Sequence, residues 1–433
     1  MAITREQNER LVRVEGDAPM GKLLRENYWV PACLMAQLVP GGDPIRVRLF
    51  GRDHVAFRAD DGRIGFFDER CPHRGASLVL AHNDGCSLRC IFHGWRIDVS
   101  GKVVEVPTQA QHAEAFAERV PVKKYPTHEG GGIVWVWLGS NEASPFPDLP
   151  FTIVPESQVW MTVTKAQCNW MQGVETTLDS AHVGTLHESY LTQLKADREK
   201  ADLEKDPEKG ARSTHALANL APRYEIDITP YGLDAVALRP LEDGNTYVRT
   251  TRYIMPFISL TPFGEPDVPA VLFITSPIDD THHNLFYGTW SLTRDLDAAS
   301  VPDFMSFAIG NRPFDQQNFG GFSAGRDQNF GQDREAMRAG HYSGMVGNLL
   351  QEDMVTQASM GPIVDRTRDF LSSSDIAIVQ GRKILLEALD DFEAGRVPRG
   401  TNPDVDLREI IPQNLVIPDG MERRNFSLAE ATR

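Results

Sequence analysis

The sequence predicts an α+β protein with two domains, a mostly β domain followed by a mixed domain. A length of 433 residues is long for one hydrophobic core and suits two. From about Trp29 to Gly139 the sequence shows short strand-like runs divided by turns, and beyond that helical and strand patterns mix. The proline-rich segment Ser144–Pro150 suits a boundary. We therefore expect domains at residues 1–150 and 151–433.

Two segments indicate the β character of the first domain. Val55–Arg58 and Ile64–Phe67 flank the turn Asp60–Gly62, a pattern typical of a hairpin. Ile133–Leu138, which is rich in valine and tryptophan, lies between glycines and predicts another strand. The first domain is therefore expected to consist mostly of strands.

The second domain combines helices and strands. A helix is expected near Cys168–His187, strands within Tyr224–Ser276, and an amphipathic helix around Asp375–Phe392, where apolar residues recur at helical spacing. Leu194–Arg212 and Gly310–Gly344 show no periodicity. Loops over an active site and solvated surface explain these two segments equally well.

Composition argues against several classes of function. A formal charge of -16 repels phosphate backbones, so nucleic acid is not an expected partner. No run approaches the ~18 apolar residues that cross a bilayer, and the N-terminus lacks signal-peptide features. We expect a cytoplasmic protein without a membrane segment. Its five cysteines would then stay reduced, which directs attention to metals.

Two short loops in the first domain carry the strongest signal. Cys71-Pro-His73 and Cys90-Ile-Phe-His93 each supply one thiolate and one imidazole. Two thiolates can bind one iron and two imidazoles the other, which is the ligation of a Rieske [2Fe–2S] centre. A structural zinc site is the alternative, but zinc sites usually keep their cysteines together and their histidines together. The observed arrangement favours the Rieske cluster.

A second group of candidate ligands lies in the second domain. Glu175, Asp179 and His182 are spaced i, i+4 and i+7, so a regular helix would place them on one face. His187 lies five residues after His182, about 140° away on an ideal helix. If both imidazoles bind one metal, the helix must end or bulge between them, and Gly184 is a plausible place.

Two histidines and one carboxylate leave positions open on ferrous iron for O₂ and substrate. The third ligand is expected on a predicted helix at 349–357, where Glu352 and Asp353 are hard to separate from sequence alone. An acidic pair on the surface explains these two residues equally well.

Together the motifs resemble those of the Rieske aromatic-ring oxygenases, and more narrowly the phthalate-dioxygenase-like branch, whose oxygenase consists of large subunits only. Most of the chain takes part, including weaker motifs at Asn8–Leu11, Pro19–Arg25, Tyr28–Trp29, Glu352–Met354, Ser359–Pro362, Asp365–Thr367 and Ser374–Asp375. The resemblance implies a Rieske β-domain followed by a helix-grip (START-like) catalytic domain, assembled as a homotrimer or a hexamer of stacked trimers.

The resemblance also implies roles for individual residues. Four of them match the ligands of the cluster, namely Cys71, His73, Cys90 and His93. Three match the ligands of a mononuclear iron, namely His182, His187 and Asp353. Asp179 matches a carboxylate that links an iron histidine to a Rieske histidine of the neighbouring subunit and so carries electrons between subunits. Thr176 and Phe370–Asp375 depart from the family pattern, which leaves the shape of the pocket open.

The expected reaction is addition of O₂ to an aromatic carboxylate of the phthalate type, giving a cis-dihydrodiol. Electrons would come from NADH through a separate flavin/iron–sulfur reductase, because this chain has no Gly-x-Gly-x-x-Gly strand–helix unit. A carboxylate ligand needs arginine in so acidic a protein, and Arg223, Arg249 and Arg252 are candidates. Each is also explained as a solvated strand residue.

Three other functions stay open at this point. A monooxygenase or O-demethylase acting on a methoxylated or phenoxy aromatic acid would use the same scaffold. A Rieske electron-transfer protein without chemistry of its own would not need the paired histidines and Asp353. A zinc-stabilised binding protein would be colourless.

Overall fold

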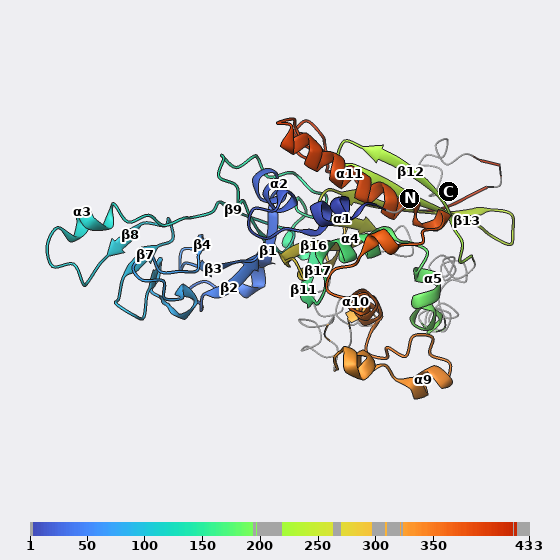
Figure 1. Ribbon diagram of the computed structural model, residues 1–433, viewed down its shortest axis with the longest axis horizontal. Coiled ribbons are helices and arrows are strands. Elements are labelled where there is room, and N and C mark those ends of the chain that lie inside the picture. The colour runs from blue at the N-terminus through green and yellow to red at the C-terminus, as the bar shows by residue number, and fades with distance from the viewer. Residues whose placement is uncertain are drawn as a thin grey trace. The chain divides into compact units, whose positions relative to one another are not determined.

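The computed structural model describes residues 3–193, 196, 219–262, 270–296, 308–309, 321, 324–418 and 420–421. Its backbone contacts divide the chain into two compact units (Figure 1). The smaller unit contains Val14–Phe146 and Ser276–Asp279. The larger unit contains Met1–Arg13, Pro147–Thr275 and Asp280–Arg433. The N-terminal helix therefore belongs to the larger unit.

The smaller unit is built from three antiparallel sheets. Their strand orders are β1-β10-β9, β2-β3-β4 and β5-β6-β7-β8. The strands are β1 (Val30–Leu34), β2 (Ile45–Leu49), β3 (Arg52–Arg58), β4 (Ile64–Asp68), β5 (His82–Asn83), β6 (Ser87–Arg89), β7 (Arg96–Asp98), β8 (Val103–Glu105), β9 (Thr127–Gly130) and β10 (Ile133–Val136). Short helices accompany them: α2 (Pro19–Asn27), η1 (Met35–Gln37), η2 (Leu78–Leu80) and α3 (Ala113–Ala117).

Both β segments predicted in this part of the chain are confirmed. β3 and β4 form the expected antiparallel hairpin, with Ala56 opposite Phe66. The predicted strand at Ile133–Leu138 is β10. Apolar side chains of this hairpin, including Phe57 and Phe67, form one buried cluster that also contains Cys71 and Cys90. The core of the unit therefore directly supports the two Cys/His loops.

The larger unit contains a long antiparallel sheet of strand order β11-β17-β16-β15-β14-β13-β12. The strands are β11 (Val159–Ala166), β12 (Arg223–Thr229), β13 (Gly232–Pro240), β14 (Thr246–Ile254), β15 (Ile258–Thr261), β16 (Ala270–Asp279) and β17 (His282–Trp290). β18 (Gln413–Ile417) pairs with residues 246–250 of β14, while residues 252–254 pair with β15. One edge of β14 is thus shared by two strands from distant parts of the sequence.

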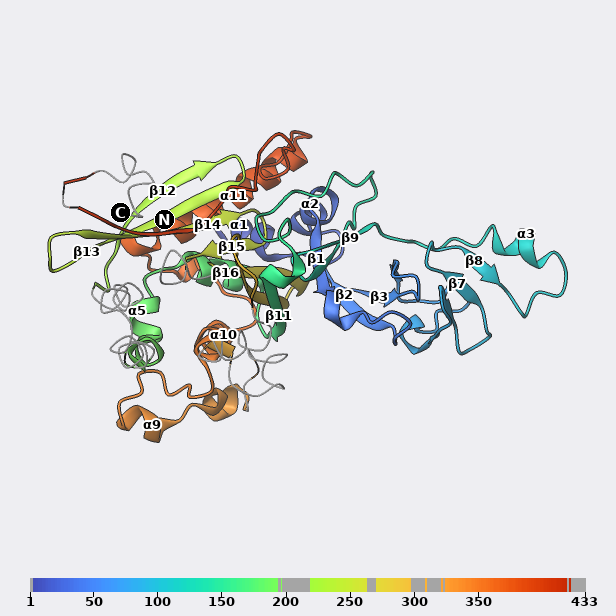
Figure 2. The ribbon, with the colours of Figure 1, turned by 180° about the vertical axis from the view of Figure 1, so that it is seen from behind.

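Besides this sheet the larger unit contains helices. They are α1 (Arg5–Val12), η3 (Glu156–Gln158), α4 (Trp170–Leu178), α5 (Val183–Leu186), η6 (Arg326–Gly331), α9 (Arg334–Arg338), α10 (Leu349–Ser359), η7 (Arg366–Arg368), η8 (Ser373–Asp375) and α11 (Ile376–Glu393). The predicted amphipathic helix is confirmed as α11, which contacts α4, β12 and β13 (Figures 1 and 2). Its buried residues, such as Ile384, Leu385 and Leu389, recur at helical spacing. The α+β class is confirmed.

The two segments without periodicity are described only in part. Leu194–Arg212 lies outside the described residues apart from residue 196. Of Gly310–Gly344, residues 310–320 and 322–323 lie outside, and the rest includes η6 and α9. Within the described ranges, no helix is both long enough and apolar enough to cross a membrane.

Candidate metal centres

The two Cys/His loops of the smaller unit share one backbone geometry. In the first, the Gly75 N–H donates to the Cys71 carbonyl at 2.8 Å; in the second, the Gly94 N–H donates to the Cys90 carbonyl at 2.9 Å. Both glycines have positive φ, +80° and +72°, a conformation that other residues adopt only at a cost. A glycine after each histidine therefore closes the two loops into matching turns.

These turns bring the four expected cluster ligands together in pairs. The ring centroids of His73 and His93 lie 4.5 Å apart, and His73 stacks on Trp95 at 4.5 Å. Cys71 and Cys90 are buried and form no disulfide. Burial, assisted by the neighbouring Cys90 thiol, raises the pKa of Cys71 to about 11. Two buried thiols beside a pair of imidazoles fit a Rieske cluster.

The helix expected near Cys168–His187 is interrupted at a different place from the one predicted. α4 ends at Leu178, and α5 is a separate single turn. The break occurs at Asp179, whose Oδ1 accepts a hydrogen bond from the Ala181 N–H at 2.7 Å and so competes with helical bonding. The prediction of a break at Gly184 is therefore wrong, since this residue lies inside α5, but the helical turn does end between the two histidines, at Leu186.

The expectation that Glu175 shares a helix face with Asp179 and His182 is also wrong. Glu175 instead accepts hydrogen bonds from Arg366 Nε at 2.6 Å and from Arg382 Nε at 2.7 Å. Burial opposes its negative charge, but the two guanidinium groups outweigh burial and lower the pKa of Glu175. Glu175 is thus part of a buried ionic cluster that joins α4 to η7 and α11.

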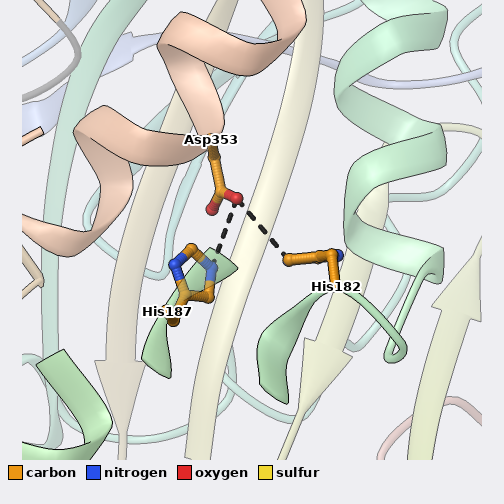
Figure 3. A group of neighbouring side chains, drawn as sticks. All are labelled: His182, His187 and Asp353. Carbon is orange, nitrogen blue, oxygen red and sulfur yellow. Dashed lines mark ion pairs between the residues drawn. The ribbon is translucent and has the colours of Figure 1, made fainter. Parts of the chain in front are cut away.

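Three of the predicted ligands form a compact group (Figure 3). Potential ligand atoms of His182, His187 and Asp353 all lie within 4.8 Å of one another. Asp353 Oδ1 is 3.5 Å from His182 Nε2 and 3.3 Å from His187 Nε2. It is buried, and among the described residues it has no hydrogen-bond partner. A cation between these three atoms would satisfy that oxygen, so the group fits a two-histidine, one-carboxylate iron site.

The electrostatic surroundings of the group favour positive charge. Burial lowers the pKa of His187, but the carboxylates of Asp353 and Glu352 outweigh it and raise the pKa to about 9. Burial raises the pKa of Asp353, but His187 and His182 outweigh it and keep the pKa below its ordinary value. Both shifts show that the carboxylates of this group favour a positive charge between them, as a cation site requires.

The other ring nitrogen of each histidine is also held by a carboxylate. His182 Nδ1 lies 3.2 Å from Asp179 Oδ2, and His187 Nδ1 lies 2.7 Å from Glu352 Oε2. Glu352 and Asp353, which the sequence could not separate, thus both approach His187, from opposite edges of its ring. An ionised carboxylate only accepts hydrogen bonds, so Asp179 and Glu352 favour a proton on each Nδ1, and a bound cation would take the place of any proton on Nε2.

A pocket of about 140 Å³ lies beside the group, and Asp179, His182, His187 and Asp353 are part of its wall. Cavities of about 150 Å³ accept benzene, so the pocket has room for one aromatic ring. Apolar and aromatic side chains dominate its wall, among them Leu191, Phe273, Leu285, Tyr287 and Met354. Sequence reasoning missed these residues because they come from distant strands and helices. Alternation along a strand shows which face is apolar, but not that the face borders a metal site.

The structure separates the three candidate arginines. Only Arg249 lines this pocket. Arg252, three positions along the same strand, points to the opposite face of the sheet and pairs with Asp234. Arg223 pairs with Glu225, and 71% of its side chain is exposed. Arg249 Nη1 contacts only the hydroxyls of Ser180 and Thr251, at 3.3 Å each, and forms no ion pair with any described residue.

Comparison with known proteins identifies both units. The Rieske [2Fe-2S] domain family matches residues 28–126, and the family described as LigXa C-terminal domain like matches residues 136–432. The phthalate 4,5-dioxygenase oxygenase subunit of Pseudomonas putida is 35% identical over 98% of this chain and 94% of its own length. The chain belongs to the Rieske non-haem iron ring oxygenases. As an oxygenase of this family it carries a Rieske cluster and a mononuclear iron, which excludes the zinc-stabilised binding protein and the simple electron carrier.

Other relatives of this Rieske oxygenase differ in reaction. The 3-chlorobenzoate-3,4-dioxygenase oxygenase subunit of Comamonas testosteroni is 33% identical over 93% of this chain and 92% of its own. The 5,5'-dehydrodivanillate O-demethylase oxygenase subunit of Sphingobium sp. is 25% identical over 95% and 86%. The terminal oxygenase of carbazole 1,9a-dioxygenase from Nocardioides aromaticivorans superposes with a TM-score of 0.59 at 18% identity, covering 91% of this chain and 99% of its own. The family is therefore established, while its members act on different compounds.

Proposed function

We propose that this Rieske oxygenase adds both atoms of O₂ to the ring of an aromatic carboxylate of the phthalate-isomer type and releases a cis-dihydrodiol. Each turnover consumes one O₂, two electrons and two protons. The electrons would come from NADH through a separate flavin/iron–sulfur reductase. Two relatives whose names specify dioxygenation of phthalate or 3-chlorobenzoate are more than 30% identical to this chain, which supports both the reaction and the substrate class.

The observation that carries the substrate class is the position of Arg249. It is the only arginine or lysine among the described residues that line the pocket, and it forms no ion pair with them. A guanidinium group binds a carboxylate through two parallel hydrogen bonds, which fixes the orientation of the bound ring as well as its affinity. Arg249 would therefore hold the substrate carboxylate while the apolar wall encloses the ring.

The ligand sets follow from the two groups of side chains. We propose that the cluster is bound by Cys71, His73, Cys90 and His93, and the mononuclear iron by His182, His187 and Asp353. Ferrous iron bound in this way has open positions for O₂ beside the substrate. The protein would contribute carboxylates that attract a cation, a ring-sized pocket, and a hydrogen-bond acceptor at each Nδ1 that leaves Nε2 to the bound metal.

Asp179 would connect the two centres between subunits. Its carboxylate already contacts His182. Because 22% of the Asp179 side chain is exposed, an imidazole from another subunit can reach it. We propose that His73 or His93 of a neighbouring copy binds there, in a homotrimer or in a hexamer of two stacked trimers. Assembly would then be part of the electron path.

O-demethylation of a methoxylated aromatic acid is the second candidate function. The relative named as a 5,5'-dehydrodivanillate O-demethylase supports it, since it aligns with 95% of this chain. A ring-sized pocket with one arginine suits a methoxybenzoate as well as a phthalate. Products distinguish the two reactions, because demethylation releases formaldehyde and a phenol.

A single turnover with ¹⁸O₂ tests the proposal. Chemically reduced, iron-replete protein is mixed with phthalate isomers, phenoxybenzoates and methoxybenzoates, and the products are identified by mass spectrometry. We expect a cis-dihydrodiol that contains two labelled oxygens from a phthalate isomer. Formaldehyde and a singly labelled product from a methoxybenzoate, with no product from any phthalate, would establish the demethylase instead.

A further inference from the structure

Glu352 is a buried carboxylate that the proposed reaction does not yet use. Its side chain is fully buried, and its Oε2 lies 2.7 Å from His187 Nδ1. Asp353, the next residue on α10, approaches the opposite nitrogen of the same ring at 3.3 Å. The two neighbouring acids thus enclose one imidazole, and only Asp353 faces the position between His182 and His187.

Within the described part of the chain, the charge of Glu352 has no basic ion-pair partner other than this histidine. His187 is the single ion-pair partner of Glu352 among the described residues, whereas Glu175, 13% of whose side chain is exposed, is paired with two arginines. A buried carboxylate is costly unless it is paired and hydrogen-bonded. The negative charge of Glu352 is therefore compensated through His187, and a cation on the other side of the ring would complete that compensation.

A loop before α10 holds the second oxygen of Glu352. Ser343 Oγ donates a short hydrogen bond to Glu352 Oε1 and accepts one from the Met345 N–H at 3.0 Å. The Tyr190 hydroxyl donates to the Met345 carbonyl at 2.8 Å. Since Tyr190 follows His187 by three residues, the loop connects both ends of the His187–Glu352 pair.

We propose that Glu352 is a positioning residue for the mononuclear iron. It holds His187 with the proton on Nδ1 and with Nε2 directed at the metal, and Ser343 fixes the carboxylate in the orientation that this requires. A carboxylate behind a ligating histidine sets its tautomer, fixes its ring and raises its basicity. The inference rests on the proposed iron site at His182, His187 and Asp353 and assigns that site a further residue.

Metal affinity tests the proposal without any turnover. The mononuclear iron is removed from the full chain by mild chelation that leaves the Rieske cluster in place, and Co²⁺ is titrated back against a competing chelator. Glu352→Gln, which keeps the shape and loses the charge, should weaken Co²⁺ binding by about 10- to 100-fold. It should also alter the visible absorption of the bound Co²⁺, while the spectrum of the Rieske cluster stays unchanged.

Matched variants separate this role from a general loss of stability. Glu335→Gln makes the same chemical change at a side chain that is 92% exposed and should leave Co²⁺ binding unaltered. Ser343→Ala keeps Glu352 and removes one of its donors, so a smaller loss of affinity is expected. If Glu352→Gln does not fold, the Co²⁺ affinity of Ser343→Ala decides whether Glu352 positions His187. Asp353→Asn should abolish binding at this site.

The outcomes distinguish the inference from the proposed function. Native affinity and absorption in both Glu352→Gln and Ser343→Ala, with binding lost in Asp353→Asn, would overturn the role of Glu352 and leave the iron site standing. Native Co²⁺ binding in Asp353→Asn would instead contradict the iron site itself.

Discussion

At the scale of single residues, both proposed iron histidines use their two ring nitrogens in the same way. Asp179 holds Nδ1 of His182 and Glu352 holds Nδ1 of His187, while both Nε2 atoms face Asp353. Since an ionised carboxylate accepts hydrogen bonds and donates none, the pattern favours the tautomer with the proton on Nδ1 in both rings when a metal binds Nε2. In the proposed iron site, Asp179 and Glu352 would therefore act through the histidines, and Asp353 would bind the metal directly.

Replacement of Asp179 tests its role between the centres. Asp179→Asn should retain both metals and still contact His182, but it should slow oxidation of the Rieske cluster by O₂ and substrate by roughly 10- to 100-fold. Rapid-mixing absorption measurements on the reduced protein follow this step. A rate equal to that of the native protein would remove Asp179 from the electron path.

Replacement of Arg249 tests recognition of the substrate carboxylate. Arg249→Met should raise KM for a phthalate by about 10- to 150-fold, which corresponds to roughly 1.5–3 kcal/mol for a hydrogen bond to a charged group. Steady-state kinetics with the reductase measure this KM. Arg223→Met is the matched control, because Arg223 is exposed and lies outside the pocket. Equal KM values in the two variants would argue against a carboxylate at Arg249.

At the scale of elements, helix α4, which lines the pocket and precedes Asp179, is fixed by the ionic cluster around Glu175. Arg366 and Arg382 come from η7 and α11, and Arg366 also lies 3.3 Å from Asn8 of α1. Glu175→Gln would leave two buried guanidinium groups without their shared partner, and we expect a loss of about 3–5 kcal/mol in unfolding free energy. Urea denaturation measures the unfolding free energy. Glu387→Gln on α11 is the control, because Glu387 is exposed.

The same cluster predicts a pH dependence of stability. The arginines lower the pKa of Glu175 below its ordinary value of 4.5. A carboxyl group with a lowered folded pKa stabilises the protein fully above its unfolded pKa, and this stabilisation is lost as pH falls through the folded pKa. Between neutral pH and pH 3, the native protein should therefore lose more stability than Glu175→Gln. Parallel losses in the two proteins would contradict the cluster's contribution.

The sequence predicts those parts of the sites whose ligands lie close together in the chain. Cys71 and His73 are two residues apart, and Cys90 and His93 three, so each loop shows its chemistry directly. Asp353 is different. It and Glu352 are neighbours on a helix and point about 100° apart, so only the packing of α10 decides which of them faces the metal group.

The break after α4 and the pocket wall could not be predicted in the same way. No glycine or proline marks the end at Leu178, where the side chain of Asp179 replaces a helical hydrogen bond. A spacing of three places Arg249 and Arg252 on opposite faces of a strand, yet the sequence does not show which face borders the pocket. Tertiary packing decides where α4 ends and which face of β14 lines the pocket.

At the scale of the whole molecule, the proposed assembly makes electron transfer a property of the oligomer. A Cys90→Ser chain would lack the cluster and an Asp353→Asn chain would lack the mononuclear iron, so each alone should be inactive. Oligomers formed from both chains should recover activity, because the cluster of one copy would serve the iron of its neighbour. The two chains are co-expressed with different tags, oligomers that contain both tags are purified, and their turnover measures the recovered activity. Mixed oligomers with no activity would indicate that electrons do not cross between subunits.

The most direct test of the central claim is the iron and acid-labile sulfide content of three purified proteins. If the Cys/His loops and the His182–His187–Asp353 group bind separate centres, the native chain should contain about three iron and two sulfide per chain. Asp353→Asn should contain about two iron with unchanged sulfide, and Cys90→Ser about one iron without sulfide. Loss of sulfide in Asp353→Asn, or its retention in Cys90→Ser, would contradict the assignment of the two centres.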